Sequence, residues 1–301
     1  MTGVHSGGGD DLLRARVDGT LSAVTMSNVS IIKSCAFAKC ESLLEVSFPD
    51  CVEIKMSAFE GCGSLYKVSF PLCETINSTA FQYCYSLSSI YFPNCKSIGT
   101  QAFRWCSTLT SINFQNCTYI SQGGFDSCIN LKSAIFPKCS VVGYSAFEGC
   151  ENLSNISFPI CSILYGCAFY HCKKINYADF PLCKEIPDHA FYYCTSLSNI
   201  NFPIASMVGS SAFVNCTSLV SVNLPSCTRI YTYAFSSCSK LNTIVLGAST
   251  VCSLYTSSAF KNTPIANGTG YIYVPSSLVA SYKTKTNWTY FSSRIFAIES
   301  M

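Results

Sequence analysis

Cysteine is the residue type with the widest chemical repertoire in this 301-residue chain, which contains 21 of them. Thiolates attack electrophiles, bind soft metals and pair as disulfides. Ten cysteines recur every 22 residues from Cys40 to Cys238, and eight share that spacing between Cys51 and Cys227, with Ala205 in the one gap. If each period is one coil of a stack, each series forms a column of side chains about 4.8 Å apart.

Three states are open to thiols in such columns. Disulfides are common in secreted chains, but neighbours that point the same way keep their Cβ atoms farther apart than the roughly 3.8 Å that a bridge prefers. A metal site needs thiolates that converge tetrahedrally, and a column does not converge. We therefore expect buried, reduced thiols whose S–H groups donate to backbone carbonyl groups.

A second candidate for chemistry is a cysteine next to a histidine. Cys167 and His189 fall at the same position of neighbouring repeats, with Asp188 beside them. An imidazole that takes the thiol proton would activate a nucleophile. No phosphate-binding loop, H-E-x-x-H or G-x-S-x-G motif accompanies the pair, so we expect a plain surface pair. The sequence predicts no catalytic residue, no metal and no cofactor.

Phenylalanine identifies the elements that position these groups. It returns every 22 residues from Phe37 to Phe235 without a slip. A fixed period of this length is typical of a stack of supersecondary units, none of which buries its apolar side alone. The sequence therefore predicts a repeat solenoid.

Each repeat has a strand half and a return half. With Leu43 as position 1, the order L-x-x-V-x-F-x-x-C fits the leucine-rich repeat pattern. Val46 and Phe48 alternate with polar residues, which predicts a parallel β-strand that ends at Pro49. The Ala-Phe pair at positions 16 and 17 predicts one short helical turn on the return side.

The unit C-x-S-L-x-x-I-x-F-P-x-C-x-x-I-x-x-x-A-F, read here from Cys84 to Phe103, resembles the BspA-like leucine-rich repeat family. The resemblance covers about residues 18–275. It implies a right-handed horseshoe or rod that is secreted or displayed on a particle, serves adhesion and carries no catalytic residues. The commoner unit of the family is one residue longer.

The chain divides into three predicted regions. Residues 1–17 form a flexible N-terminal segment, and residues 18–275 hold eleven repeats and a final strand. Residues 276–301 form a C-terminal cap, with a short helix and apolar residues that include Tyr282 and Trp288. Residues 1–17 contain no apolar stretch suited to a signal peptide, so we expect none in this chain.

Charge and hydropathy exclude two classes of partner. Only 12% of the residues are charged, the net charge is +3, and no Lys/Arg cluster occurs, which argues against nucleic acid. No apolar run approaches the roughly 18 residues that span a bilayer, so membrane insertion is not expected.

Two surfaces are candidates for binding a partner. The strand residues that point outward form a polar face of mostly short side chains. Its candidate binding residues are Glu45, Lys67, Tyr91, Asn113, Tyr177, Asp179 and Asn201. Positions 18 and 19 of the return side form an aromatic ridge of Tyr83, Trp105, Tyr170, His171, Tyr192 and Tyr193. Aromatic faces with a polar handle suit sugars and protein hot spots. Solvation of a bare sheet explains the first surface equally well, and chance exposure is the alternative for the second.

The leading hypothesis is a non-enzymatic module that binds a protein or glycan of a host or neighbouring cell, displayed on a bacterial surface. The first alternative is a phage tail-associated protein that attaches to a receptor. The second is a spacer without a ligand. All three place the chain outside the cell or on a phage particle.

Overall fold

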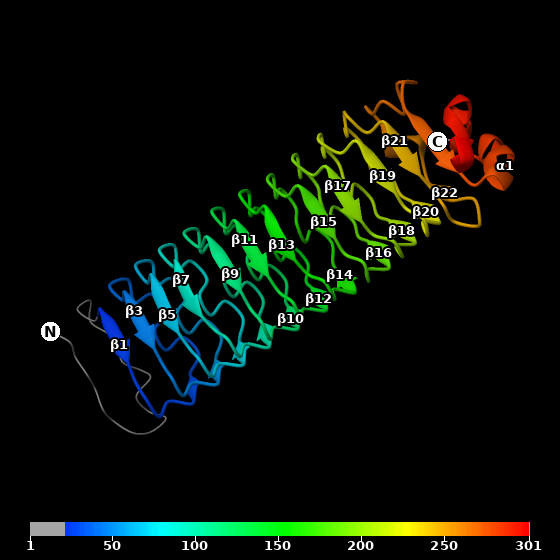
Figure 1. Ribbon diagram of the computed structural model, residues 1–301. Coiled ribbons are helices and arrows are strands. Elements are labelled where there is room, and N and C mark those ends of the chain that lie inside the picture. Colours follow the sequence, from blue (N-terminus) through cyan, green and yellow to red (C-terminus); the bar gives the residue numbers. More distant parts are fainter. Residues whose placement is uncertain (1–21, 301) are drawn as a thin grey trace. The chain divides into compact units, whose positions relative to one another are not determined.

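The computed structural model describes residues 22–300, which are drawn in colour in Figure 1. The chain falls into two compact units. Unit 1 runs up to Phe158, and unit 2 begins at Pro159. The N-terminal segment predicted for residues 1–17, and Leu21 at the predicted start of the first repeat, lie outside the described residues. The boundaries 18–275 and 276–301 stay a prediction of the sequence.

Unit 1 is a stack of coils, each with two short strands that pair in parallel with those of the next coil. Val24 lies opposite Val46, 22 residues on, and every described pair of this unit keeps that register. The longer strands are β1 (Ala23–Thr25), β3 (Glu45–Ser47), β5 (Lys67–Ser69), β7 (Ser89–Tyr91), β9 (Ser111–Asn113), β11 (Ser133–Ile135) and β13 (Asn155–Ser157). The shorter strands are β2 (Ile31–Ile32), β4 (Glu53–Ile54), β6 (Thr75–Ile76), β8 (Ser97–Ile98), β10 (Tyr119–Ile120) and β12 (Val141–Val142).

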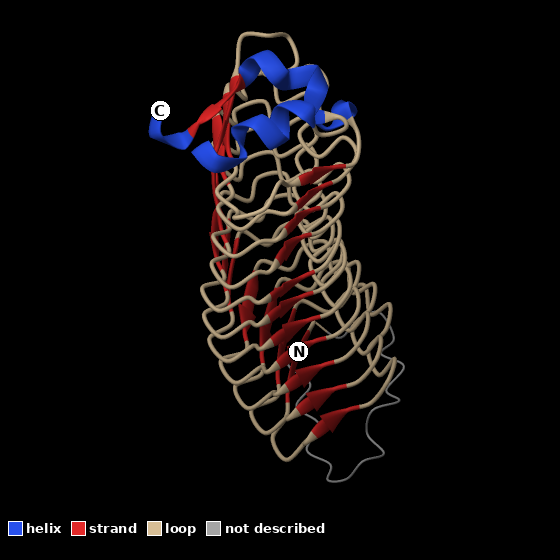
Figure 2. Cartoon of the chain, turned by 90° about the vertical axis from the view of Figure 1, so that its right-hand side faces the viewer, coloured by secondary structure: helices blue, strands red, loops and turns tan. Residues whose placement is uncertain are grey.

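Unit 2 repeats the same coil and then closes with helices. Its longer strands are β15 (Tyr177–Asp179), β17 (Asn199–Asn201), β19 (Ser221–Asn223), β21 (Thr243–Val245) and β23 (Tyr271–Val274). Its shorter strands are β14 (Ile163–Leu164), β16 (Glu185–Ile186), β18 (Met207–Val208), β20 (Arg229–Ile230) and β22 (Ser253–Leu254). The helical segments are η2 (Ser257–Phe260), η3 (Ser276–Leu278), α1 (Val279–Thr284), η4 (Trp288–Arg294) and η5 (Ile298–Ser300), and β24 (Ile295–Ala297) pairs with β23. Figure 2 shows the helices gathered at the C-terminal end of this unit.

The predicted repeat solenoid, with an in-register parallel strand in each 22-residue repeat, is confirmed within each unit. The sequence did not predict the second strand of each repeat. Two residues are too few to show an alternating pattern, so this strand has no signal in the sequence.

Phenylalanine columns fill the core of the coils. In unit 1, the rings of Phe59 and Phe81 stack with their centroids 5.1 Å apart and their planes 3° from parallel. Phe70 and Phe92 of the strand half stack in the same way at 5.3 Å, and Phe59 meets Phe70 edge to face at 5.9 Å. All four are buried, and such ring pairs add to the free energy gained from burial. The fixed sequence period is thus the packing period of the core.

The return half of each repeat is a run of turns where the sequence predicted a single helical turn. The N–H of Phe59 donates to Ala80 O of the next coil at 2.8 Å, whereas the N–H of Cys62 donates back to Phe59 O at 3.2 Å. Backbone N–H groups therefore alternate between holding the neighbouring coil and closing a tight turn. This alternation needs left-handed backbone at two positions per repeat, for example Ser57 (φ 56°) and Gly61 (φ 73°).

The C-terminal helices cover the last coil of unit 2, as the predicted helical cap requires. Trp288 and Tyr282 are fully buried. The indole Nε1 of Trp288 donates to Cys252 O at 2.7 Å, and the N–H of Cys252 donates to the Tyr282 hydroxyl at 2.9 Å. The cap therefore satisfies backbone groups that have no further coil to pair with.

Candidate binding surfaces

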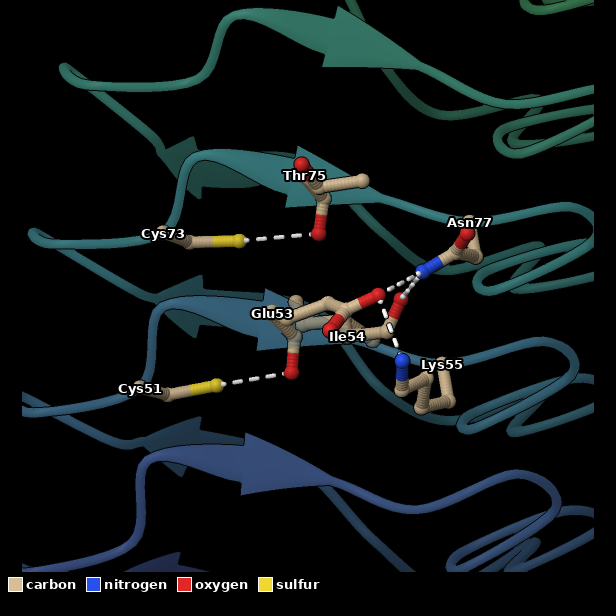
Figure 3. Close-up of polar contacts among 7 residues, drawn as sticks. All are labelled: Cys51, Glu53, Ile54, Lys55, Cys73, Thr75 and Asn77. Carbon is tan, nitrogen blue, oxygen red and sulfur yellow. Dashed lines mark hydrogen bonds and ion pairs between the residues drawn. The ribbon is translucent and has the colours of Figure 1, made fainter.

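The thiols of the two cysteine columns serve as hydrogen-bond donors. In the first column, Cys84 Sγ donates to Phe59 O of the preceding coil at 3.1 Å, and Cys106 Sγ donates to Phe81 O at 3.2 Å. In the second, Cys51 Sγ donates to Glu53 O at 3.3 Å, as Figure 3 shows. The prediction of buried thiols that donate to carbonyl groups is confirmed at these positions.

Burial also changes the acidity of these thiols. Desolvation of the thiolate raises the pKa of Cys51 to about 11 and that of Cys73 to about 12, from an ordinary value of 9.0. At neutral pH these groups are protonated, and a protonated thiol is a poor nucleophile and a poor metal ligand. Among residues 22–300, no cluster of three or more His, Cys, Asp or Glu side chains is arranged to hold a metal ion.

Cys167 and His189 occupy the same position on successive coils of unit 2, and both lie on left-handed backbone with φ near 56°. The N–H of Cys167 donates to Asp188 O at 3.0 Å. Oδ1 of Asp188 accepts the N–H of Ser210 at 2.6 Å, so this oxygen holds the next coil. The His189 ring lies 5.7 Å from that of Tyr192, which places it at the side of the aromatic ridge.

The strand face of unit 1 carries four of the predicted residues. Lys67 Nζ and Glu45 Oε2 form an ion pair at 3.1 Å, and the Tyr66 hydroxyl also donates to Glu45. The Tyr66 hydrogen bond, with the Lys67 ammonium second, lowers the pKa of the Glu45 carboxyl. Tyr91 is 56% exposed, and Oδ1 of Asn113 accepts from the nearby Gln115. Glu45 and Lys67 thus bind each other across neighbouring strands.

The strand face of unit 2 carries the remaining three. Tyr177 and Asp179 are exposed on β15, and Asn201 lies on β17. Asn201 Nδ2 donates to Asp179 Oδ1 at 2.7 Å. Tyr177 begins β15 and Asp179 ends it, and both side chains are exposed.

The structure brings four of the predicted aromatic residues into one cluster on unit 2, which we call the unit 2 ridge: Tyr170, His171, Tyr192 and Tyr193. Tyr170 stacks on Tyr192 with centroids 4.8 Å apart and planes 4° from parallel. His171 stacks on Tyr193 at 4.8 Å and 21°. Two rows of two rings therefore follow the coils, and Tyr192 lies 5.0 Å from Tyr193 between the rows.

Half of this ridge sits on a backbone conformation that disfavours it. His171 and Tyr193 both have φ of 60°. Gly61 and Gly149 occupy the equivalent position of two coils in unit 1. A left-handed conformation costs a residue with a Cβ about 1–2 kcal/mol, and bulky side chains are rare there. The coil imposes this conformation at the same position of every repeat, including Lys39, Tyr83 and Trp105, so the ridge residues accept its cost rather than cause it.

The two ridge residues of unit 1 do not form such a cluster. Tyr83 and Trp105 share the left-handed backbone, with φ of 62° and 63°. Tyr83 lies 6.0 Å from Tyr85, a residue that the sequence did not single out. Trp105 makes no ring contact with any residue of the described range. At the equivalent positions of unit 1, Tyr83 and Trp105 therefore do not stack on each other as the rings of the unit 2 ridge do.

Two further aromatic groups in unit 2 were not predicted. Tyr231 stacks on Tyr255 at 4.1 Å, although the insertion in the last repeat places them 24 residues apart, not 22. At the end of the strand face, Tyr271 and Tyr273 of β23 lie 5.8 and 6.3 Å from Phe296 of β24. Only the alternation Tyr-Ile-Tyr in β23 gave a sequence signal for this second group.

Coils of this length, with two series of parallel strands and a return of turns, define a leucine-rich repeat solenoid. The profile described as "BspA type Leucine rich repeat region (6 copies)" matches residues 19–94, 74–181 and 162–280. The chain therefore belongs to the BspA-type leucine-rich repeat family.

The chain is similar to solved structures, and the first of these shows the same fold. A leucine-rich repeat protein from Bacteroides ovatus ATCC 8483 aligns with a TM-score of 0.55 and 20% identity, over 92% of each chain. A leucine rich cell surface protein from Faecalibacterium prausnitzii A2-165 aligns with a TM-score of 0.49 and 22% identity, over 94% of this chain and 85% of that one. No curated protein matches the sequence. Within residues 22–300, no helix has the length and apolar character that crossing a membrane requires.

Proposed function

We propose that this chain is a non-enzymatic binding module of a bacterial cell surface, and that it contacts a protein or glycan of a host or neighbouring cell through the unit 2 ridge. The observation that carries the proposal is the stacking of Tyr170 on Tyr192 and of His171 on Tyr193, with His171 and Tyr193 on left-handed backbone.

The energetics of the ridge support a contact role. Left-handed backbone costs His171 and Tyr193 about 1–2 kcal/mol each. Each ring pair stabilises the folded chain by about 0.5–1.5 kcal/mol. These terms roughly cancel, so folding stability gives aromatic residues no clear advantage over glycine at this position. A role in binding supplies a reason for them.

The chemistry of the side chains supports the same role. Tyrosine offers a large rigid face and a hydroxyl at low entropic cost, which is why it is frequent at binding hot spots. The raised pKa of buried thiols such as Cys73 supports a non-catalytic role for the columns, because those thiols stay protonated. A bacterial surface location is supported by membership of the BspA-type family, as the sequence resemblance implies.

A cell-binding assay tests this function. The fluorescently labelled full chain is added to cultured epithelial cells, and bound chain is measured by flow cytometry. We expect the double variant Tyr170→Ser/Tyr192→Ser to bind at least about tenfold less tightly, because hot-spot truncations cost more than about 1 kcal/mol each. The matched control is Tyr119→Ser, which removes an exposed tyrosine from β10 in unit 1.

Circular dichroism verifies that both variants are folded. Equal binding by the wild type and the double variant would contradict the proposal. Absence of binding by the wild type would also contradict it, and would favour the spacer.

A further inference from the structure

We propose that the outer faces of Tyr192 and Tyr193, together with the polar side chains of Asn215 and Ser237 that follow them along the coils, form a site for a neutral saccharide. This inference rests on the proposed function and names the ligand class of the same ridge.

The two ring rows end at Tyr192 and Tyr193. Each ring has its partner, Tyr170 or His171, in the preceding coil. The following coil carries Val214 and Asn215 at the equivalent positions, and Tyr193 N–H donates to Val214 O at 2.8 Å. No ring of the described residues stacks on Tyr192 or Tyr193 from that side. One face of each terminal ring is therefore directed toward a coil with smaller side chains.

The next two coils supply hydrogen-bonding groups in line with Tyr193. Asn215 and Ser237 occupy the same position of the repeat, with φ of 61° and 60°, and both are partly exposed. Nδ2 of Asn262 donates to Ser237 Oγ at 3.3 Å, which extends the polar line by one coil. An amide and a hydroxyl each donate and accept, as the hydroxyl groups of a sugar require.

The charge of the surrounding sequence favours a neutral ligand. Residues 190–228 contain no Asp, Glu, Lys or Arg. A phosphate, a carboxylate or a nucleic acid would need cationic partners for affinity, and the stretch that carries Tyr192, Tyr193 and Asn215 offers none, although Lys261 follows on the coil beyond Ser237. The ligand must therefore be held by stacking and by neutral hydrogen bonds.

A saccharide matches this combination better than a protein side chain does. The negative face of an aromatic ring attracts weakly positive C–H groups, and a sugar ring presents a flat row of them. Its hydroxyl groups lie at the edge of the same ring, where Asn215 and Ser237 would meet them. A protein hot spot fills a desolvated pocket with an apolar anchor, whereas here Val214 follows Tyr192 and the polar side chains of Asn215 and Ser237 follow Tyr193.

The experiment is an array of neutral oligosaccharides ending in galactose, glucose, mannose or N-acetylglucosamine, probed with the full chain. The best ligand is then titrated by calorimetry. We expect Tyr193→Gly, which suits the left-handed backbone, to weaken binding at least about tenfold. Tyr193→Phe keeps the ring face, so its affinity should stay within about threefold. Asn215→Ala should lose about fivefold for one hydrogen bond. Tyr119→Ser serves as the matched control and should bind like the wild type.

Two results would overturn the inference: no neutral oligosaccharide bound at millimolar concentration, or equal affinity of wild type and Tyr193→Gly. If the array is negative but Tyr170→Ser/Tyr192→Ser still loses cell binding, the saccharide site is wrong and the proposed function stands. If that double variant also binds cells normally, both are wrong.

Discussion

At the scale of single residues, the ridge combines stacked rings with a left-handed position that recurs at the same place in every repeat. Serine, asparagine and glycine serve at this position in other coils, for example Ser127, Asn215 and Gly149. These are small residues, and glycine and asparagine tolerate the conformation best. Bulky residues such as Tyr83, Trp105 and Tyr193 tolerate it least, and of these three only Tyr193 stacks on the equivalent residue of the preceding coil, His171.

The first prediction isolates this backbone cost. Tyr193→Gly and Tyr193→Ala both remove the same ring contacts, but only alanine keeps a Cβ at φ 60°. We expect the glycine variant to be more stable than the alanine variant by about 1 kcal/mol. Urea unfolding at neutral pH measures the difference. A more stable alanine variant would show that the left-handed conformation is not imposed by the coil.

Some of these features follow from the sequence and others do not. The strand of Val46 and the column of Phe59 follow from period and alternation, because the core dictates both. The left-handed backbone at Trp105 could not be predicted, since tryptophan itself disfavours it and the coil imposes it. The stacking of Tyr255 on Tyr231 was not predicted, because the insertion in the last repeat moves Tyr255 out of the 22-residue register.

At the scale of elements, the cysteine columns couple stability to pH. In the folded chain Cys51 and Cys73 hold their protons up to pH about 11 and about 12. In the unfolded chain a thiol releases its proton at pH about 8.5–9. Between these values the folded state binds more protons, so the free energy of unfolding falls as pH rises.

We therefore expect the chain to be less stable at pH 10 than at pH 8, as measured by urea unfolding under reducing conditions. The variant Cys73→Ser removes one raised pKa and should show a smaller fall between the two pH values, since serine does not titrate there. An identical fall in the variant and the wild type would mean that burial does not raise the pKa of this thiol.

The C-terminal cap is the second element whose contribution is measurable. Trp288 is buried against Tyr282 at 5.2 Å and caps the Cys252 carbonyl, so we expect Trp288→Ala to cost about 3–5 kcal/mol of unfolding free energy. Tyr290 lies on the same helix η4 and is 75% exposed. Tyr290→Ala should change stability by less than about 0.5 kcal/mol. Comparable losses from both variants would contradict the role of the cap.

At the scale of the whole molecule, the two units are built from the same kind of coil but carry different side chains on its surface. In unit 1, Glu45 and Lys67 form an ion pair on the strand face, and Tyr83 and Trp105 on the return side do not stack on each other. Unit 2 gathers its aromatic residues in the ridge and continues with the uncharged coils of residues 190–228. The sequence predicted both candidate surfaces and grouped Tyr170, His171, Tyr192 and Tyr193 on neighbouring repeats, but not the stacking of their rings, because ring contacts depend on the turn geometry.

Footprinting by hydroxyl radicals tests most directly whether the unit 2 ridge is the contact surface. Tyrosine oxidation is measured by mass spectrometry with the chain free and with the chain bound to epithelial cells. We predict protection on binding at Tyr170, Tyr192 and Tyr193, and unchanged oxidation of Tyr91 and Tyr177 on the strand faces. Protection of the strand-face tyrosines with the ridge left reactive would contradict the assignment.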